Sequence, residues 1–548
     1  MLHVQNDLAG RGTDPRSKHS KHRPRRLGKL RTMIHVALSN RTAQFRCPVE
    51  LHEELKEFYS YMKPGAQFTP GFRDGSWDGR VSLFKRGCAP TGLFLETLPE
   101  LRKQFKVAKL DRSALIFPKL NQTTFKSDNL RPYQDAAVAA MLKNSGCGGL
   151  LIASTGCGKT FTTAEYFRYV ADNCVFVVDE LTLLEQARQE MGKVLGEEIG
   201  VVGKSLFTPK RVTVATVQTL HRHRAEREFI KWFKTVEVVV IDEIHVAINK
   251  RNIDVIHSIK PKAVFGLTAT LELEKPHVRI LATALAGPVI FQYSLQTGVA
   301  EGFLSRGLVC KLLFYDPLKG LAPGYESTAV RRNKVTWKNE RVKIWIPSGS
   351  DPAKYRYHIV LNKQRNDLVE ALARESVKLG RRTVILTEHK IHLARLDKRL
   401  TDVPHALISG AQKDSERFAA KSTMDSGELP LILASRVFGK GIDIKSVDTI
   451  IDAGAQPGRN GVIQRYGRGA RKAAGKAGLL FLDVSDVGSK FAGAARNRSN
   501  ALAELGTEVL EMRWMGDAGV VFEECLENLR AIESATEPQA RSGDVKGT

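Results

Sequence analysis

Short runs of apolar residues alternate with helical segments over most of the chain, and this alternation restricts the fold more than any other feature. Apolar runs of strand length are typical of strands buried on both faces, as in a parallel sheet. One series occupies residues 130–298 and a second occupies residues 303–485. The sequence therefore predicts two α/β domains in tandem. The runs lie at 149–153, 175–178, 212–215, 236–241 and 264–267, and then at 384–386, 406–409, 429–434, 449–451 and 479–484.

The segments outside the two series have different patterns. A mixture of short strand-like runs with one helical stretch, at 50–62, predicts a small α+β domain ahead of the first series. Residues 328–357 are polar and basic, and we interpret them as an insertion or extended loop. Near the C-terminus, Leu502, Leu505, Val509 and Leu510 have helical spacing. The regions expected are a disordered basic arm at 1–33, the small domain at 34–125, α/β domains at 126–300 and 301–490, and a helical extension with a disordered end at 491–548.

Charge indicates the kind of partner. The 548 residues include 84 Lys and Arg against 59 Asp and Glu, which gives a formal net charge of +25. Such an excess favours a polyanionic partner, and nucleic acid is favoured over an anionic membrane. No apolar run approaches the ~20 residues that a membrane-spanning helix needs. The seven scattered cysteines form no CxxC pair, which suggests a reducing cytoplasm and no structural zinc.

The first 34 residues contain nine Lys and Arg and no apolar centre of the kind found in secretory signals. We interpret them as a flexible basic arm. An organelle transit peptide is the alternative, but Asp7, Asp14, Pro15 and Pro24 would interrupt the amphipathic helix that such a peptide needs.

A glycine-rich segment, ASTGCGKT at residues 153–160, follows an apolar run and opens a helical stretch. This is the context of a phosphate-binding loop, in which backbone N–H groups and a helix N-terminus hold phosphate oxygens. Lys159 would contact the β and γ phosphates, and Thr160 would bind Mg²⁺. Ala153 stands where the general motif has its first glycine. The nucleotide-binding residues expected in the loop are Thr155, Gly156, Cys157, Gly158, Lys159 and Thr160.

Two adjacent carboxylates, Asp242 and Glu243, end the apolar run at 236–241. Acids at a strand end beside a phosphate-binding loop suit phosphoryl-transfer chemistry. Asp242 would hold Mg²⁺, while Glu243 would orient and deprotonate the attacking water. His245 would report the state of the nucleotide to another segment.

Six segments in order along residues 130–471 resemble the motifs of superfamily 2 helicases of the DExH-box type. The resemblance implies two RecA-like domains that hydrolyse ATP, with Arg131 and Gln134 facing the nucleotide and Thr268 and Thr270 coupling hydrolysis to movement. It also implies nucleotide contacts from Gly441 and Asp443. The matching segments are LRPYQ at 130–134, the phosphate loop, DEIH at 242–245, LTAT at 267–270, VFGKGID at 437–443 and QRYGRGAR at 464–471.

The last of these segments has a physical interpretation of its own. A guanidinium brought to the γ-phosphate in the transition state can be worth ~10³ to 10⁵ in rate. We expect Arg468 and Arg471 to act in this way, with Gln464 in the same catalytic set. Because they belong to the second domain, the ATP site would close only when the two domains meet.

Nucleic-acid contacts are predicted from weaker signals. Trp77 with Arg73 and Arg80 would offer a stacking ring among phosphate-binding groups, although a Trp that stabilises the small domain is an equal alternative. Thr216 and Gln218 would contact the nucleic-acid backbone or cap a helix. Residues 178–182 and the pair Ser435 and Arg436 depart from the helicase pattern at positions that contact nucleic acid in that family, so their contacts are open.

The region around 72–84 resembles the small domain that precedes the motor in phage UvsW-type helicases. The resemblance implies action on branched DNA and RNA:DNA hybrids, in the cytoplasm of a bacterium or a phage-infected host. We therefore expect a monomeric ATP-dependent DNA helicase or translocase that binds branched or single-stranded DNA independently of sequence and takes part in replication, recombination or repair. An RNA helicase or a duplex translocase without unwinding activity is one alternative. A catalytically silent nucleic-acid-binding protein is another.

Overall fold

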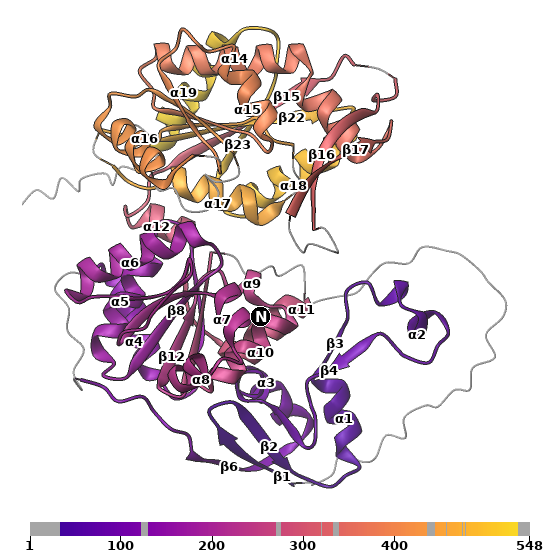
Figure 1. The fold of residues 1–548 in the computed structure, drawn as a ribbon, viewed down its shortest axis with the longest axis vertical. Helices are drawn as coiled ribbons and strands as arrows, with labels where there is room; N and C mark the ends of the chain where they lie inside the picture. The colour runs from indigo at the N-terminus through magenta and orange to yellow at the C-terminus, as the bar shows by residue number, and fades with distance from the viewer. Residues whose placement is uncertain are drawn as a thin grey trace, which may run out of the picture.

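The computed structural model describes residues 33–121, 130–269, 276–318, 320–332, 339–410, 412–435, 444–455, 458–473, 475–476 and 478–534. Figure 1 shows two α/β lobes stacked along the long axis, with a smaller domain beside the first lobe. The phosphate loop lies in the first lobe, and the Arg-rich segment 464–471 lies in the second.

The small N-terminal domain is built on a four-stranded sheet in the order β5-β2-β1-β6. In β1 every second side chain is buried, which fits a sheet that has one face on the core. The helix predicted at 50–62 is shorter, because α1 ends at Phe58 and residues 60–62 form the strand β3. The elements are β1 Met33–Ser39, β2 Thr42–Arg46, α1 Leu51–Phe58, β3 Ser60–Met62, α2 Pro70–Arg73, β4 Arg80–Ser82, β5 Cys88–Pro90, α3 Thr91–Gln104 and β6 Lys106–Ala114.

The first lobe contains an eight-stranded sheet in the order β10-β9-β11-β8-β12-β13-β7-β14, parallel except for the β9–β10 pair. All five predicted apolar runs are strands in it. Separate apolar clusters cover its two faces, so the central strands are buried on both sides. The strands are β7 Gly149–Ala153, β8 Asn173–Val178, β9 Gly200–Gly203, β10 Leu206–Thr208, β11 Val212–Thr216, β12 Val236–Ile241, β13 Ala263–Thr268 and β14 Val289–Tyr293; the helices are α4 Pro132–Lys143, α5 Lys159–Tyr169, α6 Leu181–Leu195, α7 Val217–His223, α8 Arg227–Phe233, α9 Ile244–Ala247, α10 Lys250–Ile259, α11 Pro276–Ala286 and α12 Leu295–Ala300.

The second lobe contains a seven-stranded sheet in the order β19-β20-β18-β21-β22-β15-β23, and every pair is parallel. All five runs predicted here are strands as well. Two parallel-sheet lobes of this kind are the RecA-like pair that the sequence predicts. The elements are β15 Gly307–Tyr315, α13 Asp351–Tyr355, α14 Lys363–Lys378, β18 Thr383–Leu386, α15 Lys390–Asp397, β19 His405–Ile408, α16 Asp414–Ser426, β20 Leu431–Ala434, β21 Thr449–Asp452, α17 Arg459–Gly469, β22 Leu479–Val487, α18 Ala492–Ala503, β23 Glu508–Arg513 and α19 Ala518–Ser534.

Two expectations for this lobe are corrected. Val509 and Leu510 lie in the strand β23, which pairs with β15, so the C-terminal extension is not helical throughout. Two adjacent apolar residues fit a helix and a strand equally well, and pairing with β15 selects the strand. The insertion at 328–357 is not an extended loop: it contains most of an antiparallel hairpin made of β16 Tyr325–Arg332 and β17 Asn339–Ile346.

The two lobes are in contact beside the phosphate loop. Leu304, in the segment that connects the two lobes between α12 and β15, forms an isolated β-bridge with Arg471. The backbone N–H of Ser305 donates to the carbonyl of Ala470 at 2.6 Å. A Cβ added to Gly467 of α17 would lie 2.9 Å from Cβ of Thr155. The end of α17 is thus held against the phosphate loop of the other lobe.

Candidate active site

The phosphate loop joins the end of β7 to the first residue of α5. Gly156 and Gly158 have φ values of +94° and +74°, a region that favours glycine. A Cβ at Gly158 would approach Nε2 of Gln134 to 2.7 Å, and a Cβ at Gly156 would lie 3.0 Å from Cγ of Arg471. Both glycines are therefore required by conformation and by close neighbours.

Side chains of α4 fix the back of the loop. The carbonyl of Cys157 accepts hydrogen bonds from the hydroxyl of Tyr133 at 3.0 Å and from Nε2 of Gln134 at 3.2 Å. Oε1 of Gln134 accepts from the backbone N–H of Arg131 at 3.0 Å. The guanidinium of Arg131 lies 5.2 Å from the ring centroid of Phe303. Arg131 and Gln134, predicted as nucleotide contacts, thus lie directly behind and beside the phosphate loop.

Lys159 reaches across the mouth of the loop. Its Nζ donates to the carbonyl of Ala153 at 3.2 Å and lies 3.7 Å from Oε1 of Glu243. Oγ1 of Thr155 is buried and has no hydrogen-bond partner among the described residues. An ammonium group and an unpaired hydroxyl at one loop suit a phosphate ligand.

The two carboxylates follow β12 as the sequence predicts. Burial, reinforced by the neighbouring charge of Glu243, raises the pKa of Asp242 to about 6. Oδ1 of Asp242 accepts from the backbone N–H of Glu243 at 3.1 Å. Glu243 itself has a φ of +45°, a left-handed backbone conformation that non-glycine residues seldom adopt and that is typical of functional sites.

Arg468 of α17 and Arg471, two residues after the end of that helix, enter the same site from the second lobe. Both line a cavity of about 420 Å³ together with the phosphate loop and both carboxylates. Burial lowers the pKa of each guanidinium to about 10, so both keep their charge at neutral pH. The charges of Glu243 and Asp242 act on Arg468, and the charge of Glu190 acts on Arg471. The eight residues of the first lobe that were predicted to bind the nucleotide all line this cavity, together with Asp242 and Glu243. They are Arg131, Gln134, Thr155, Gly156, Cys157, Gly158, Lys159 and Thr160.

One predicted member of the catalytic set is displaced from the cavity. Gln464 is not among the described residues that line it, because it lies one helical turn before Arg468. Gly441 and Asp443, predicted to contact the nucleotide, fall outside the described residues. Further residues line the cavity that the sequence motifs did not predict, among them Glu190, Phe303, Lys445 and Lys472. Lys472 could have been predicted, because it directly follows Arg471 of the last motif. Nothing in the sequence around Glu190 or Phe303 indicates that they line the cavity.

His245 lies between Glu243 and the end of β13. Its Nδ1 lies 3.2 Å from Oγ1 of Thr268 and 3.4 Å from Oε2 of Glu243. One imidazole ring therefore lies within contact distance of both side chains. Thr270, the other residue predicted to couple hydrolysis to movement, lies outside the described residues.

The predicted nucleic-acid residues of the lobes lie in varied surroundings. Thr216 is buried at the start of α7, with its Oγ1 2.8 Å from Oγ1 of Thr219. Nε2 of Gln218 donates to the carbonyl oxygen of Asp179 at 2.7 Å, and Gln218 lines an open groove of about 900 Å³ with Arg222 and Arg224. Ser435 is buried at the end of β20, while Arg436 falls outside the described residues.

In the small domain, Trp77 is half-buried and lies between exposed Arg73 and Arg80. Its Nε1 donates to the carbonyl of Arg80 at 2.8 Å, and Nζ of Lys63 lies 5.6 Å from its ring centroid. The ring therefore stabilises the local turn and is also partly open to a ligand. Both interpretations given by the sequence remain compatible with this position.

Across the described parts of the chain, no helix has the length and apolar character needed to cross a bilayer. In the same residues, no group of three or more His, Cys, Asp and Glu side chains is arranged to hold a metal ion. All seven cysteines are free thiols.

Comparison with known families identifies three segments. Residues 127–273 match the family described as type III restriction enzyme, res subunit; residues 363–473 match the helicase conserved C-terminal domain; and residues 35–106 match the N-terminal domain of the DNA helicase UvsW. With the two lobes and the motifs in order, these matches make the chain a superfamily 2 helicase. Its N-terminal domain further makes it UvsW-like.

Similar proteins span most of the chain. The DNA 3'-5' translocase XPB2 of Sulfurisphaera tokodaii is 24% identical over 385 residues, which are 68% of this chain and 84% of the relative. The ATP-dependent DNA helicase uvsW of Enterobacteria phage T4 is 22% identical, over 80% of this chain and 88% of the relative. The crystal structure of T4 UvsW aligns with 88% of this chain and 99% of its own, at 18% identity and a TM-score of 0.40.

Proposed function

We propose that this chain is an ATP-dependent DNA helicase or translocase that moves on and remodels branched DNA or R-loops. One observation carries the proposal: a single cavity brings together a phosphate loop, two strand-end carboxylates and two guanidinium groups from the opposite lobe. Its volume of about 420 Å³ is within the range of small-molecule sites, roughly 300–1,000 Å³. Hydrolysis at a site shared by two lobes changes the contact between them.

The residues of the cavity fit a magnesium–nucleotide complex. Thr160 and Asp242 both line it and offer the hard oxygen ligands that Mg²⁺ prefers. The unpaired hydroxyl of Thr155 and the ammonium of Lys159 suit the phosphate oxygens. When bound, Mg²⁺ would neutralise charge on the β and γ phosphates.

The chain's own groups then divide the work. Glu243 orients the attacking water and accepts its proton, while Arg468 and Arg471 stabilise the charge that spreads over the transferring phosphoryl group. Gly441 and Asp443 are proposed to complete the nucleotide contacts from the second lobe, and Gln464 to support the arginines. His245 passes the state of the site to Thr268, with Thr270 in the same coupling segment.

DNA is proposed as the substrate on two grounds. Relatives that span at least two-thirds of the chain are named DNA translocases and helicases. The net charge of +25 suits a polyanion held through its phosphates, without readout of sequence. We propose Arg73, Trp77, Arg80, Thr216, Gln218, Ser435 and Arg436 as contact residues, and a monomer as the active form.

The arginine role is tested with Arg468→Ala. Turnover should fall by roughly 10³-fold or more, because the transition-state charge loses its partner. Nucleotide binding should stay near the parent value, since Lys159 and the loop lie in the other lobe. ATPase rates and nucleotide affinity are measured together, with Arg227→Ala on the far helix α8 as a control. Parent turnover in Arg468→Ala would exclude this role.

The substrate is tested with a panel of forked DNA, Holliday junctions, R-loops, linear duplex DNA and duplex RNA. We expect ATPase activity to be stimulated most by branched DNA or R-loops, with strand displacement on the same substrates. Displacement of duplex RNA alone would indicate an RNA helicase. Stimulated ATPase without displacement would indicate a duplex translocase, and no ATPase at all would indicate a silent binding protein.

A further inference from the structure

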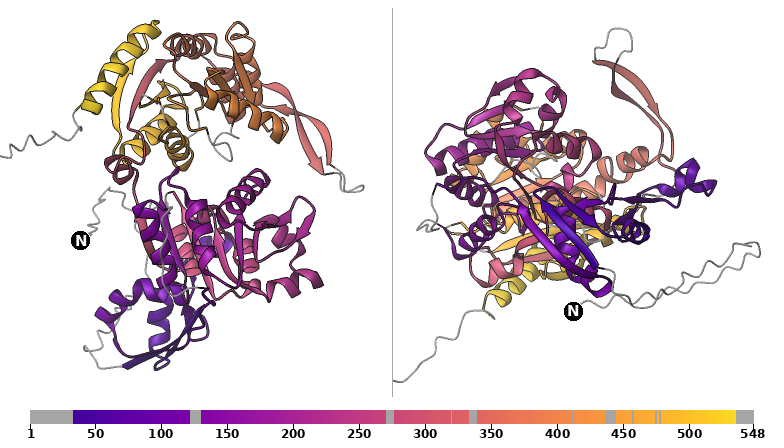
Figure 2. Two further views of the ribbon diagram at one scale, coloured as in Figure 1. Left: turned by 90° about the vertical axis from the view of Figure 1, so that its left-hand side faces the viewer. Right: turned by 90° about the horizontal axis from the view of Figure 1, so that it is seen from below.

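The hairpin β16–β17 extends from the second lobe and is not part of either lobe's sheet. Both views in Figure 2 show it standing clear of the body of that lobe. It lies between residues 274 and 362, a stretch that none of the three family matches covers. The side chains of the hairpin itself therefore indicate its role.

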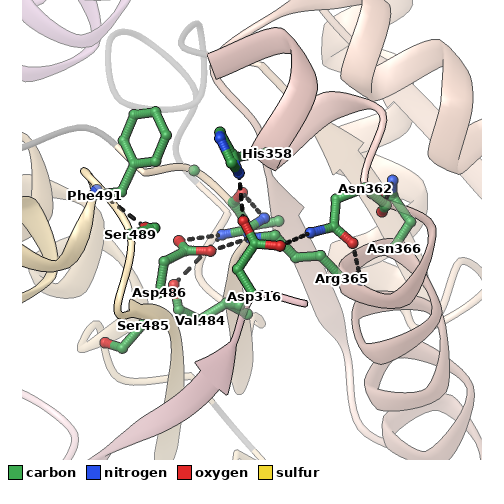
Figure 3. A network of polar contacts seen from close by, with 12 residues as sticks. Asp316, His358, Asn362, Arg365, Asn366, Val484, Ser485, Asp486, Ser489 and Phe491 are labelled. Atoms are coloured by element: carbon green, nitrogen blue, oxygen red, sulfur yellow. Dashed lines mark hydrogen bonds and ion pairs between the residues drawn. The ribbon is translucent and has the colours of Figure 1, made fainter. Parts of the chain in front are cut away.

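The base of the hairpin is firmly attached to the lobe. Asp316, which follows β15, contacts Nδ1 of His358 at 2.5 Å and accepts from Nδ2 of Asn362 at 2.8 Å (Figure 3). Asn362 also caps α14, where Arg365 pairs with Asp486 at 2.8 Å in a fully buried site. Both ends of the insertion are thus fixed to one buried network, which orients the hairpin relative to the lobe.

Further contacts join the two hairpin strands at their base. The carbonyl of Ala322 accepts from Oγ of Ser348 at 2.8 Å and from the backbone N–H of Gly349 at 2.9 Å. The guanidinium of Arg356 lies 4.4 Å from the ring centroid of Tyr325. An isolated two-stranded hairpin is marginal in water, so these contacts explain how this one keeps its form.

The two faces of the hairpin differ in exposure. The pairing of Glu326 with Trp345 and of Val330 with Arg341 places alternate residues on one face. Every described residue of that face is exposed, whereas those of the opposite face are half-buried except Glu340, which is exposed. Trp345 is 67% exposed. The exposed face consists of Glu326, Thr328, Val330, Arg341, Lys343 and Trp345.

Charge and aromatic content distinguish this hairpin from an ordinary solvated one. Residues 325–346 contain six Lys and Arg against two Glu, and two of the five Trp residues of the chain. Nζ of Lys343 is already paired with Oε1 of Glu326 at 2.9 Å, so among the side chains that the structure describes on this face Arg341 is the cation that remains for a ligand. An exposed ring and a guanidinium on the same face of one strand, four residues apart, offer the stacking and phosphate contacts by which proteins bind single-stranded nucleic acid.

We propose that the exposed face of β16–β17 binds single-stranded DNA, with an unpaired base stacked on Trp345 and a phosphate paired with Arg341. This assignment rests on the proposed action on DNA and adds a contact surface in the second lobe, apart from the nucleotide cavity. A base within a duplex could not reach the ring face, so the surface selects unpaired strands.

The test measures binding of a labelled oligo-dT strand by fluorescence anisotropy, with full-length protein and no nucleotide. Trp345→Val keeps a strand-forming residue but removes the ring, and we expect affinity to fall about tenfold, as loss of one stacked base does. Trp345→Phe keeps a ring and should recover most of the affinity. Arg341→Gln should lower the slope of log K against log salt by about 0.7. Phe418→Ala, an exposed aromatic on α16, is the control and should bind like the parent.

The outcomes separate this proposal from the proposed function. Parent affinity in Trp345→Val, in a protein with DNA-stimulated ATPase, would overturn the hairpin assignment and leave the helicase intact. Weakened DNA binding by Trp345→Val, in a protein that has no ATPase activity, would overturn the proposed helicase function and leave the hairpin assignment intact. Equal weakening by Trp345→Val and Trp345→Phe, with an unchanged salt slope in Arg341→Gln, would mean that the substitutions act on the fold of the hairpin, and would also overturn the assignment.

Discussion

Glu243 shows how a single residue combines strain with chemistry. Its backbone occupies the left-handed region, and its carboxylate lies between Lys159 and His245. The strained backbone turns the side chain back toward the phosphate loop instead of along the line of β12. This placement costs folding energy, on the order of 1–3 kcal/mol, which the surrounding site has to offset.

Replacement of Glu243 by Gln should cut ATP turnover by roughly 10²- to 10⁴-fold, because the amide cannot accept the proton of the attacking water. Nucleotide affinity should change little, since Asp242 and the loop are retained. Steady-state ATPase and equilibrium nucleotide binding measure the two effects. Glu198→Gln, an exposed surface change, is the matched control. A variant with parent turnover would remove Glu243 from the proposed role.

The sequence predicted the types and order of the site residues better than their exact positions. The loop glycines, Asp242 and Arg468 follow from motif spacing, and the structure places them around one cavity. The sequence places Gln464 in the same motif as the arginines, but it does not show which part of α17 faces the cavity. In the structure Arg468 lines the cavity and Gln464, one turn earlier, does not. Glu190 was missed because a carboxylate on an amphipathic helix has no local signal of burial by the other lobe.

At the scale of elements, the last turn of α17 depends on one buried lysine. Lys476 donates to the carbonyl of Arg471 at 2.9 Å and also to that of Gly469. Burial lowers the pKa of Lys476 to about 7, although the charge of Asp448 partly offsets this. Lys476 therefore satisfies carbonyl groups at the end of α17, next to Arg468 and Arg471.

Lys476 should make stability depend on pH. Between about pH 7 and about pH 10 the unfolded chain keeps the lysine proton and the folded chain has lost it, so this group stabilises the fold increasingly as pH rises. Lys476→Met lacks this dependence. The Tm of the parent minus the Tm of Lys476→Met, measured by scanning calorimetry, should therefore rise toward alkaline pH. A difference that stays constant with pH would contradict the lowered pKa.

Element type could be predicted wherever an apolar run was long and uniform. All ten runs are strands. Burial on both faces makes such a strand a continuous apolar run, which is easily distinguished from the polar segments around it. The hairpin was not predicted, although Val342, Ile344 and Ile346 alternate with polar or exposed residues. This period of two is typical of a strand, but the many Lys and Arg residues of the segment suggested a loop. The strand β23 was missed because only its pairing with β15 selects it over a helix.

At the scale of the whole molecule, charge is distributed unevenly along the sequence. Residues 1–28 contain seven Lys and Arg and two Asp. A chain without these residues should bind DNA more weakly and give a flatter slope of log K against log salt, because fewer counterions are released. Titrations at several salt concentrations test this, with a Gly/Ser arm of equal length as the control. An unchanged slope would assign the arm another role.

The strand β23 forms the outer edge of the second lobe's sheet, beside β15. A protein shortened to end before Glu508 would leave the N–H and C=O groups of β15 open along that side. Unpaired strands of this kind invite pairing between molecules and aggregation. The C-terminal segment therefore covers β15 and limits aggregation at this edge of the sheet, and any fragment designed for expression should retain it.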